Sequence, residues 1–367
     1  MNIGVPRERR PDENRVGLTP AGVQLLVAEG HVCYVEQGAG HGAGFTDEEM
    51  ERAGAHLVYS GEEAYGRADL VVKVARPTAE ELNWLRDGQT VLAFWHLASA
   101  SADNLETLLK RKITAIAYET IQAEDGSLPV LRSMSQIAGR MSAQVAASLL
   151  QNDYGGKGIL LGGVPGVPPA QVVILGAGVV GTHAARAFLG LGATVYALDR
   201  DLSRLEHLMG QCGQVITLIS HAFNIHKVIS FADVLVGAVL VPGVHAPCLV
   251  SRPMVQAMRP RSVILDIAID QGGCVETSRP TTHETPTYVE ENVIHYCVPN
   301  MPGVLGRTAT HALNNAAWPF VHLLATAGTT ETIAHNPALA RGVATHNGEI
   351  VARPLAAIFP APTDEAT

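Results

Sequence analysis

The sequence has few of the features that mark membrane proteins, secreted proteins and nucleic-acid-binding proteins. No run of residues reaches the ~20 consecutive apolar residues that a helix needs to cross a bilayer. The first residues, MNIGVPRERR, lack the apolar core of a signal peptide. The net charge is −9, and the longest basic stretch, Arg7 to Arg10, is interrupted by Glu8. We therefore expect a cytoplasmic protein that binds no membrane and no nucleic acid, because phosphate binding requires a basic surface.

Cysteine is also scarce, and its spacing excludes two common structural devices. The chain has five cysteines, an odd number, with no C-x-x-C pair. Disulfide frameworks and zinc sites both need paired, closely spaced cysteines. We interpret the cysteines as reduced, mostly buried thiols, namely Cys33, Cys212, Cys248, Cys274 and Cys297.

The chain is long and apolar enough to form two domains, each with its own core. It has 367 residues, of which 47% are hydrophobic. A single core seldom grows beyond about 250 to 300 residues.

The stretch 171–201 has the pattern of a dinucleotide-binding motif. A continuous apolar run, Val172 to Leu175, predicts a strand buried on both faces, and Gly176, Gly178 and Gly181 follow before a helical pattern. In such a G-x-G-x-x-G turn, the glycines allow a tight bend, a close approach of the backbone to a pyrophosphate, and packing of the helix on the strand. The N-terminus of the helix then faces the phosphate charge. Because both the strand and the helix are present, we interpret the motif as a Rossmann fingerprint.

The end of the next strand predicts which dinucleotide binds. A second apolar run, 194–198, ends in Asp199, which lies 18 residues after Gly181. A carboxylate at this position accepts hydrogen bonds from the ribose hydroxyls of NAD and repels the 2′-phosphate of NADP. Arg200 follows, and an arginine here sometimes indicates NADP, but Asp199 favours NAD.

The N-terminal part of the chain alternates strand and helix patterns without a glycine fingerprint. Such alternation predicts a parallel sheet with helices on both faces. The fold class is therefore α/β, with two doubly wound Rossmann-like domains, parallel sheets and a cleft between the domains. The strands expected in the first domain are 2–5, 31–36, 70–74, 90–95 and 114–118, with helices near 17–30, 47–53, 78–85 and 101–111.

We expect the first domain to be discontinuous in sequence. An alanine-rich helix at 138–152 precedes a loop rich in glycine and proline and is predicted to bridge the domains. A late helix, 307–327, has no strand of the nucleotide domain left to cover. We therefore assign residues 1–128 and 307–367 to a substrate domain and residues 129–306 to an NAD-binding domain. The segment beyond Asn336 is predicted to be a weakly packed tail.

Several polar side chains follow strands of the two predicted sheets. In open α/β sheets, ligands lie beyond the carboxyl ends of the strands. A guanidinium can bind a carboxylate through two hydrogen bonds, and an imidazole can exchange a proton near neutral pH. Each residue alone could be a solvated charge. Together they suit the oxidation of an amino or hydroxy acid, and they are Arg15, Lys73, Arg76, His96 and Asp270.

The sequence resembles the alanine dehydrogenase family, whose members also resemble the NAD-binding domain of proton-translocating transhydrogenase. The resemblance runs from Ile3 to about Asn315 in one continuous order. The matching stretches are IGVPRE, ENRVGLTPAGV, GAGFTDEE, HLA at His96, IAYETIQ, GSLPVL, MSQIAGRMSAQ, GGKGILLGGVPGV, LGAGVVGT, GAVLVPG, ILDIAIDQGG, THETPTY and NMPGVLGRT.

This resemblance implies a hexameric enzyme that oxidatively deaminates L-alanine to pyruvate and ammonia with NAD, or runs in reverse. It implies that Arg15 holds the substrate carboxylate, that His96 is the acid/base and that Asp270 is the second catalytic group. The positions that match the family's cofactor-binding residues are Ser135, Val179, Val180, Asp199, Arg204, Ser220, Val239, Leu240, Ile267, Asn300 and Met301.

Two parts of the sequence depart from the family pattern. Some members carry a Glu and a His as magnesium ligands on the late helix, but Leu323 and Ala327 stand there, so we expect no such metal. The family reads K-V-K-E-P after its third strand, and the second lysine binds the substrate. This chain reads Lys73, Val74, Ala75, Arg76, Pro77, so Ala75 replaces that lysine.

The departure at Ala75 leaves two alternatives to alanine dehydrogenase. In the first, the protein oxidises a different amino or keto acid, and Arg76 or Lys73 supplies the missing charge. In the second, it is a catalytically weak NAD-binding homologue. The presence of Arg15, His96 and Asp270 together favours an enzyme.

Overall fold

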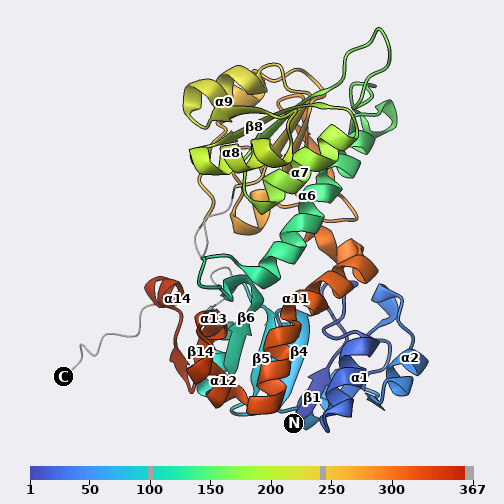
Figure 1. The fold of residues 1–367 in the computed structure, drawn as a ribbon, viewed down its shortest axis with the longest axis vertical. Helices are drawn as coiled ribbons and strands as arrows, with labels where there is room; N and C mark the ends of the chain where they lie inside the picture. The colour runs from blue at the N-terminus through green and yellow to red at the C-terminus, as the bar shows by residue number, and fades with distance from the viewer. Residues whose placement is uncertain (98–101, 240–244, 360–367) are drawn as a thin grey trace, which may run out of the picture. The chain divides into compact units, whose positions relative to one another are not determined.

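The chain forms two compact units in the computed structural model, which describes residues 1–97, 102–239 and 245–359 (Figure 1). Met1–Met134 and Gly303–Thr367 make up the first unit, and Ser135–Pro302 make up the second. One division falls inside the long helix α6 (Pro129–Leu149), whereas the sequence placed it before this helix, after residue 128.

The first unit is built on an eight-stranded sheet with the order β15-β14-β6-β5-β4-β1-β2-β3. The strands from β1 to β6 pair in parallel, and β14 is antiparallel to both β6 and β15. The strands are β1 (Asn2–Val5), β2 (Val32–Glu36), β3 (His56–Val58), β4 (Leu70–Ala75), β5 (Thr90–Phe94), β6 (Thr114–Ala117), β14 (Val343–His346) and β15 (Glu349–Ile350).

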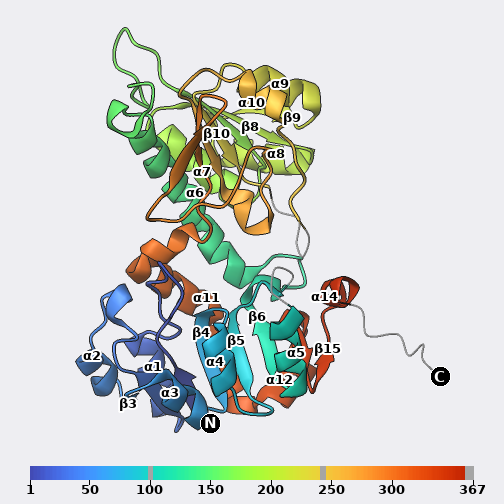
Figure 2. The ribbon, with the colours of Figure 1, turned by 180° about the vertical axis from the view of Figure 1, so that it is seen from behind.

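Helices cover both faces of this sheet. Figure 1 shows α1 and α11 in front of the sheet, and Figure 2 shows α3, α4 and α5 on the opposite face. Several helices begin at a hydroxyl cap, as in α1, where Thr19 accepts from the N–H of Gly22 and Pro20 occupies the first turn. The helices of this unit are α1 (Pro20–Ala28), α2 (Asp47–Arg52), α3 (Gly61–Arg67), α4 (Ala79–Trp84), α5 (Ala102–Lys110), α11 (Gly306–Ala327), α12 (Thr329–His335), α13 (Pro337–Gly342) and α14 (Arg353–Ile358).

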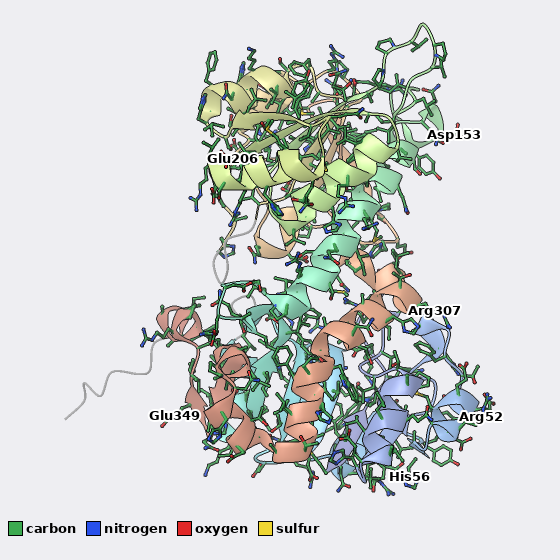
Figure 3. All side chains as sticks on the ribbon, in the orientation of Figure 1. Arg52, His56, Asp153, Glu206, Arg307 and Glu349 are labelled. Carbon is green, nitrogen blue, oxygen red and sulfur yellow. The ribbon has the colours of Figure 1, made fainter. Side chains whose placement is uncertain are left out.

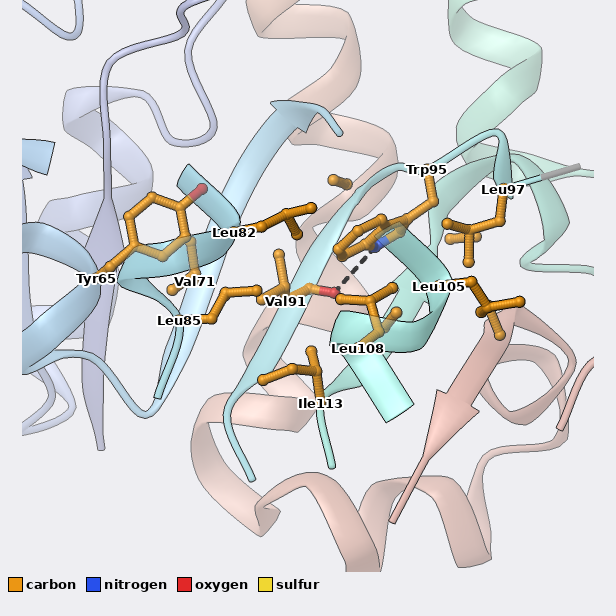
Figure 4. Close-up of a cluster of buried hydrophobic side chains, with 14 of the residues drawn as sticks. Tyr65, Val71, Leu82, Leu85, Val91, Trp95, Leu97, Leu105, Leu108 and Ile113 are labelled. Carbon is orange, nitrogen blue, oxygen red and sulfur yellow. Dashed lines mark hydrogen bonds between the residues drawn. The ribbon is translucent and has the colours of Figure 1, made fainter. Parts of the chain in front are cut away.

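The core on the face covered by α3, α4 and α5 contains large side chains from helices and strands. Tyr65, Leu82 and Leu108 from these helices pack against Val91 and its neighbours in the sheet. Figure 4 shows Trp95 directed into this cluster, where its Nε1 donates to the carbonyl of Val91 at 3.3 Å. The end of β5 is thereby fixed by a buried aromatic anchor.

The C-terminal part of the chain returns to the first unit, as the sequence predicts for 307–327. Arg307, labelled in Figure 3 at the start of α11, donates to the carbonyl of Gly44 at 3.0 Å. The prediction of a weakly packed tail beyond Asn336 is wrong. Leu339, Val343 and Leu355 are buried, and β14 adds to the sheet beside β6. β14 has four residues, and a strand this short gives no recognisable pattern in a segment rich in proline and alanine.

The second unit has a seven-stranded sheet with the order β12-β13-β11-β10-β7-β8-β9. All pairs are parallel except the pair of β12 with β13. Its six parallel strands follow the doubly wound order of a dinucleotide-binding fold. The strands are β7 (Gln171–Leu175), β8 (Thr194–Asp199), β9 (Ile216–Ile219), β10 (Val234–Gly237), β11 (Val263–Asp266), β12 (Thr287–Glu290) and β13 (Val293–Tyr296).

Helices also cover both faces of the second sheet. Alternate residues of the buried strands face α9 and α10, where Val173 and Leu235 pack against Ile225 and Val255. In Figure 1, α7 and α8 lie over the opposite face. Both units therefore confirm the predicted fold class. The further helices are α7 (Val179–Gly190), α8 (Leu202–Gln211), α9 (Ala222–Ile229) and α10 (Arg252–Gln256).

Candidate active site

The glycine loop of the second unit has the geometry that the fingerprint predicts. Gly176 has φ of +103°, and a Cβ there would lie 2.4 Å from the carbonyl oxygen of Ala238. A Cβ on Gly181 would lie 1.8 Å from the carbonyl oxygen of Gly176. Beside Gly178, in contrast, there is open space. The loop therefore packs tightly against neighbouring backbone at Gly176 and Gly181, but Gly178 faces open space at the start of α7. The N–H groups of the first helical turn there can bind a pyrophosphate.

Asp199 ends β8 beside this loop and is 7% exposed. Its Oδ2 accepts from the N–H of Ala177 at 2.7 Å, and its Oδ1 accepts from the N–H of Asp201 at 2.9 Å. The Arg204 guanidinium lies 4.0 Å from Oδ2. The carboxylate therefore holds the glycine loop and the next turn in fixed positions, a structural contribution that the sequence did not predict.

The other predicted cofactor residues of the second unit lie at the same edge of the sheet, with one exception outside the described residues. Ser135 precedes Gly139 by one turn of α6, and a Cβ on Gly139 would lie 2.4 Å from the carbonyl of Val180, so α6 packs closely against the start of α7. Leu240 falls outside the described residues. Val179 and Val180 begin α7, and those that lie in the segments after strands are Ser220, Val239, Ile267, Asn300 and Met301.

Asp270 lies in a short 3₁₀ helix, η5 (Ile267–Gln271), that follows β11. Its side chain is exposed, and its Oδ1 accepts from the N–H of Asn300 at 3.2 Å. This contact joins the ends of two neighbouring strands of one sheet.

Asp266 supports that loop and was missed by the sequence. Its carboxylate is 1% exposed and accepts from the N–H groups of Ala268, Cys274 and Val275. Burial raises the pKa of Asp266, and the hydrogen bonds from Ser278 and Cys274 oppose this rise. The chain that follows β11 is thus folded around one buried carboxylate. In the sequence, the only sign of this role of Asp266 is that an apolar strand ends in an acidic residue.

Arg15 is held firmly in the first unit. It is 4% exposed, and its Nε and Nη2 donate to the two oxygens of Glu13 at 2.6 and 2.5 Å. Its Nη1 donates to the sulfur of Met134 at 3.1 Å. A thioether is a weak acceptor, so a carboxylate could replace it at the Nη1 side of the guanidinium. The loop is fixed by α11, where Thr310 Oγ1 accepts from the N–H of Val16 at 3.1 Å.

Phe94 brings Arg15 and His96 to the same place. The Arg15 Cζ lies 5.9 Å from the centre of the Phe94 ring, and the His96 imidazole lies 6.1 Å from it at an interplanar angle of 13°. Both are predicted to contact the substrate, and one aromatic ring at the end of β5 orients both. His96 is exposed, whereas Trp95 and Leu97 on either side of it are buried.

Lys73, which the sequence predicts to bind the substrate, lies in a buried ion-pair cluster of the first unit. Its side chain is 0% exposed, and its Nζ lies 3.0 Å from Glu8 Oε2 and 2.8 Å from Glu81 Oε1. Burial alone would lower the pKa of Lys73, but the carboxylates of Glu8 and Glu81 raise it. A fully buried ammonium that neutralises two carboxylates has a structural role, because its loss would leave both buried charges uncompensated.

Arg76 lies one residue beyond the missing lysine and is half-buried. Its Nη1 donates to the carbonyl oxygen of His96 at 3.3 Å, and its own carbonyl accepts from Arg10 Nε at 3.1 Å. A cation thus lies against the main chain of His96 although Ala75 carries none.

Two absences concern the described residues alone. Within them, no group of three or more His, Cys, Asp or Glu side chains is arranged to hold a metal ion. Across the same ranges, no helix has the length and apolarity needed to span a membrane.

Comparisons with known proteins decide the family. The family model described as "Alanine dehydrogenase/PNT, N-terminal domain" matches residues 4–138, and that described as "Alanine dehydrogenase/PNT, C-terminal domain" matches residues 142–353. The chain belongs to the alanine dehydrogenase/PNT family. The glycine loop of the second unit fits the pyridine nucleotide cofactor that this family implies.

Relatives in the alanine dehydrogenase/PNT family match this chain over nearly its whole length. A protein named alanine dehydrogenase from Methanococcus maripaludis is 49% identical over 352 residues, 95% of this chain and 94% of that protein. One of the same name from Mycobacterium tuberculosis is 45% identical over 366 residues, 100% of this chain and 98% of that protein.

Solved structures of the family agree with this fold. An L-alanine dehydrogenase is similar with a TM-score of 0.94 and 46% identity, covering 98% of this chain and 99% of that one. A transhydrogenase from Sinorhizobium meliloti has a TM-score of 0.83 at 24% identity, covering 95% and 100% of the two chains, and shows a shared fold alone.

Proposed function

We propose that this protein is an NAD-dependent alanine dehydrogenase, an enzyme that oxidatively deaminates L-alanine or catalyses the reverse reductive amination. The observation that carries the proposal is the match of 45% to 49% identity to proteins named alanine dehydrogenase across almost the entire chain. These relatives do not favour the two alternatives, a different amino or keto acid substrate and a weak homologue.

The reaction converts L-alanine, NAD⁺ and water into pyruvate, ammonium, NADH and one proton. In this proposal Arg15 binds the substrate carboxylate through the side of its guanidinium that faces Met134, because Glu13 occupies the other edge. His96 accepts a proton from the substrate ammonium group and releases it to solvent; it then accepts a proton from the attacking water and delivers it to the nitrogen that leaves as ammonia. Asp270 is the second catalytic group. The cofactor supplies the acceptor for the hydride that leaves the α-carbon.

We assign the two units different tasks. Residues 1–128 and 307–367 would form the substrate domain, and residues 129–306 the NAD-binding domain. Support comes from the placement of Arg15 and His96 around Phe94 in the first unit, and of the glycine loop in the second. A hydride donor and acceptor must approach to about 3 to 3.5 Å.

The dinucleotide, oligomeric state and location complete the proposal. Asp199 favours NAD, because a 2′-phosphate would lie beside its carboxylate. By resemblance to the family, we infer a homohexamer located in the cytoplasm. Size-exclusion chromatography with light scattering tests the oligomeric state.

The test of the proposal is turnover of L-alanine with NAD, followed by NADH absorbance, and of pyruvate with NADH and ammonium. A panel of other L-amino acids is the matched comparison. We expect L-alanine to have the highest kcat/KM. A preference for a larger amino acid, or no turnover in either direction, would refute the proposal.

A further inference from the structure

His96 has an unusual main-chain conformation. Its φ is +45°, in the left-handed region that residues other than glycine seldom adopt. Such a conformation is unfavourable for a residue with a Cβ and persists only where the surroundings fix it. Because Trp95 is anchored in the core, the conformation of residue 96 determines the direction in which its side chain leaves the main chain.

Glu119 holds the N–H side of this turn. Its Oε1 accepts from the N–H of His96 at 2.6 Å, and its Oε2 accepts from the N–H of Trp95 at 3.2 Å. Glu119 lies in the 3₁₀ helix η3 (Tyr118–Thr120), directly after β6. Since Ala117 of β6 pairs with Ala93 of β5, residues two positions further along the two strands meet beyond the sheet. One carboxylate therefore satisfies two successive main-chain donors.

Arg76 holds the carbonyl side of the same residue from the opposite neighbour. It follows β4, in which Ala75 pairs with Phe94, and its Nη1 donates to the carbonyl of His96 at 3.3 Å. Burial and the charge of Arg10 lower the pKa of the Arg76 guanidinium, and Glu119 opposes this change. The N–H and the carbonyl of His96 are thus bound from two adjacent strands by groups of opposite charge.

We propose that Glu119 is a positioning residue that fixes His96 in its left-handed conformation, with Arg76 as its counterpart on the carbonyl side. The imidazole is thereby held parallel to Phe94, on the ring that Arg15 also approaches. The inference rests on the proposed role of His96 as the acid/base. It assigns a function to Glu119, which does not itself have to touch the substrate.

A purely structural role for Glu119 predicts a different outcome. A carboxylate that only terminates β5 would lower stability when removed and leave the kcat of the folded enzyme unchanged. A positioning residue lowers kcat in fully folded enzyme, because a misplacement of about 1 Å can cost about a hundredfold in rate.

The decisive variant is Glu119→Gln, which keeps the shape but turns an N–H group toward a main-chain N–H donor. We expect kcat for L-alanine to fall about tenfold to a hundredfold, with the affinity for NAD unchanged. Glu124→Gln, an exposed glutamate in the following loop, is the matched control and should behave as the parent does. Arg76→Ala is the second variant if Glu119→Gln does not fold, and it should lower kcat in the same way.

A second readout does not depend on turnover. The His96 imidazole is identified in a ¹H–¹³C spectrum by its absence in His96→Asn, and its signal should shift in Glu119→Gln and Arg76→Ala but not in Glu124→Gln. An unshifted signal in both variants, or a kcat within about twofold of the parent in both, overturns the inference. If the parent turns over no amino acid, the proposed function fails, and the imidazole signal still decides whether Glu119 positions His96.

Discussion

At the scale of single residues, Asp199 stabilises the fold around the glycine loop, and we propose that it also sets the preference for NAD. Its two oxygens accept main-chain N–H groups from the glycine loop and from the turn after β8. The carboxylate is therefore fixed in place, and a ligand that brings a second anion beside it cannot displace it. Fixed charges of this kind discriminate through repulsion as well as attraction.

We predict that the protein binds NAD at least about a hundredfold more tightly than NADP. Two like charges about 4 Å apart repel by roughly 4 kcal/mol at an effective dielectric of 20, before screening by salt. Asp199→Ser should reduce the preference for NAD over NADP. It should also weaken NAD binding, because the glycine loop loses its hydrogen bond to the carboxylate. Isothermal titration with both dinucleotides measures the ratio, and equal affinities in the parent would contradict this assignment.

Ala75 predicts weak turnover of alanine. The family's lysine gives a charged hydrogen bond to the substrate, and loss of one such bond costs about 1.5 to 3 kcal/mol, or roughly tenfold to over a hundredfold in kcat/KM. Ala75→Lys restores the family's lysine and leaves Arg76 on the carbonyl of His96, so it should raise kcat/KM for alanine. Affinity for NAD should not change.

Arg76→Glu and the double variant Ala75→Lys with Arg76→Glu complete a double-mutant cycle with Ala75→Lys. If Arg76 already replaces the lysine, Arg76→Glu alone should lower kcat/KM most, and Ala75→Lys should rescue it. If the parent is already fast and Ala75→Lys adds nothing, the missing lysine is not limiting.

At the scale of elements, close packing between β7 and α7 depends on one missing side chain. A Cβ on Gly181 would lie 1.8 Å from a carbonyl oxygen, well inside van der Waals contact. Gly190, at the end of the same helix, has nothing within 4 Å of the position a Cβ would take. Gly190 is therefore a control position, in the same helix, for a substitution at Gly181.

We predict opposite effects for two glycine substitutions in α7. Gly181→Ala should destabilise the protein by about 1 to 3 kcal/mol and abolish tight NAD binding, because the helix must move away from the loop. Gly190→Ala should stabilise it by roughly 0.5 to 1 kcal/mol, since alanine loses less backbone entropy. Thermal unfolding and NAD titration of both variants check this, and equal effects would disprove the packing argument.

Lys73 joins β4 to α4 and to the loop after β1 through two buried carboxylates. Lys73→Met should cost roughly 3 to 5 kcal/mol, because it leaves Glu8 and Glu81 without their cation. Lys110→Met, on the exposed end of α5, is the control and should be nearly neutral. Chemical denaturation of both variants measures the difference.

The deficit of Lys73→Met should depend on pH. In the parent, Lys73 lowers the pKa of Glu81 below 4.5, so that contribution is present above pH 4.5 and is lost as pH falls through the lowered pKa. The raised pKa of Lys73 contributes stability that is present below pH 10.5 and lost as pH rises through the raised value. Burial raises the pKa of Glu8 above 4.5, so the deficit should begin to shrink as pH falls through that raised pKa and shrink further through the lowered pKa of Glu81. A deficit that is independent of pH would refute the ion pair.

At the scale of the whole molecule, the chain divides its proposed tasks between two units with the same strand order. Each unit has its own core, and the chain passes from one to the other within α6 and again near Pro302. The groups proposed to bind the substrate carboxylate and move protons lie mainly in the first unit, and the glycine loop lies in the second.

We predict that NAD binding and turnover can be separated by mutation. His96→Asn should abolish measurable turnover of alanine while NAD still stabilises the protein, by about 2.7 kcal/mol at a concentration a hundredfold above Kd. Thermal shift with NAD checks this, with the parent as control. Loss of the NAD-dependent shift in His96→Asn would show that the two tasks are not separate.

The sequence predicted the strands and the glycine loop well because each depends on neighbours in the chain. Apolar runs predicted the parallel strands β1, β2, β4, β5, β6, β7 and β8, and glycine spacing predicted the turn before α7. The short elements β3, α3 and β12 were not predicted, and α6 begins nine residues earlier than expected, at Pro129 rather than Ala138. Short elements carry little periodicity, and tertiary pairing stabilises them.

The sequence by itself determined the fold class, the fingerprint with Asp199 and the family, because these depend on residue type and spacing along the chain. Only the tertiary structure decided how Lys73, Arg76 and Glu119 are used, since it decides which charges meet. It buries Lys73 between two carboxylates and brings Arg76 and Glu119 to opposite sides of His96. Residues from three adjacent strand ends meet there, and no pattern within one strand reveals its partners across the sheet.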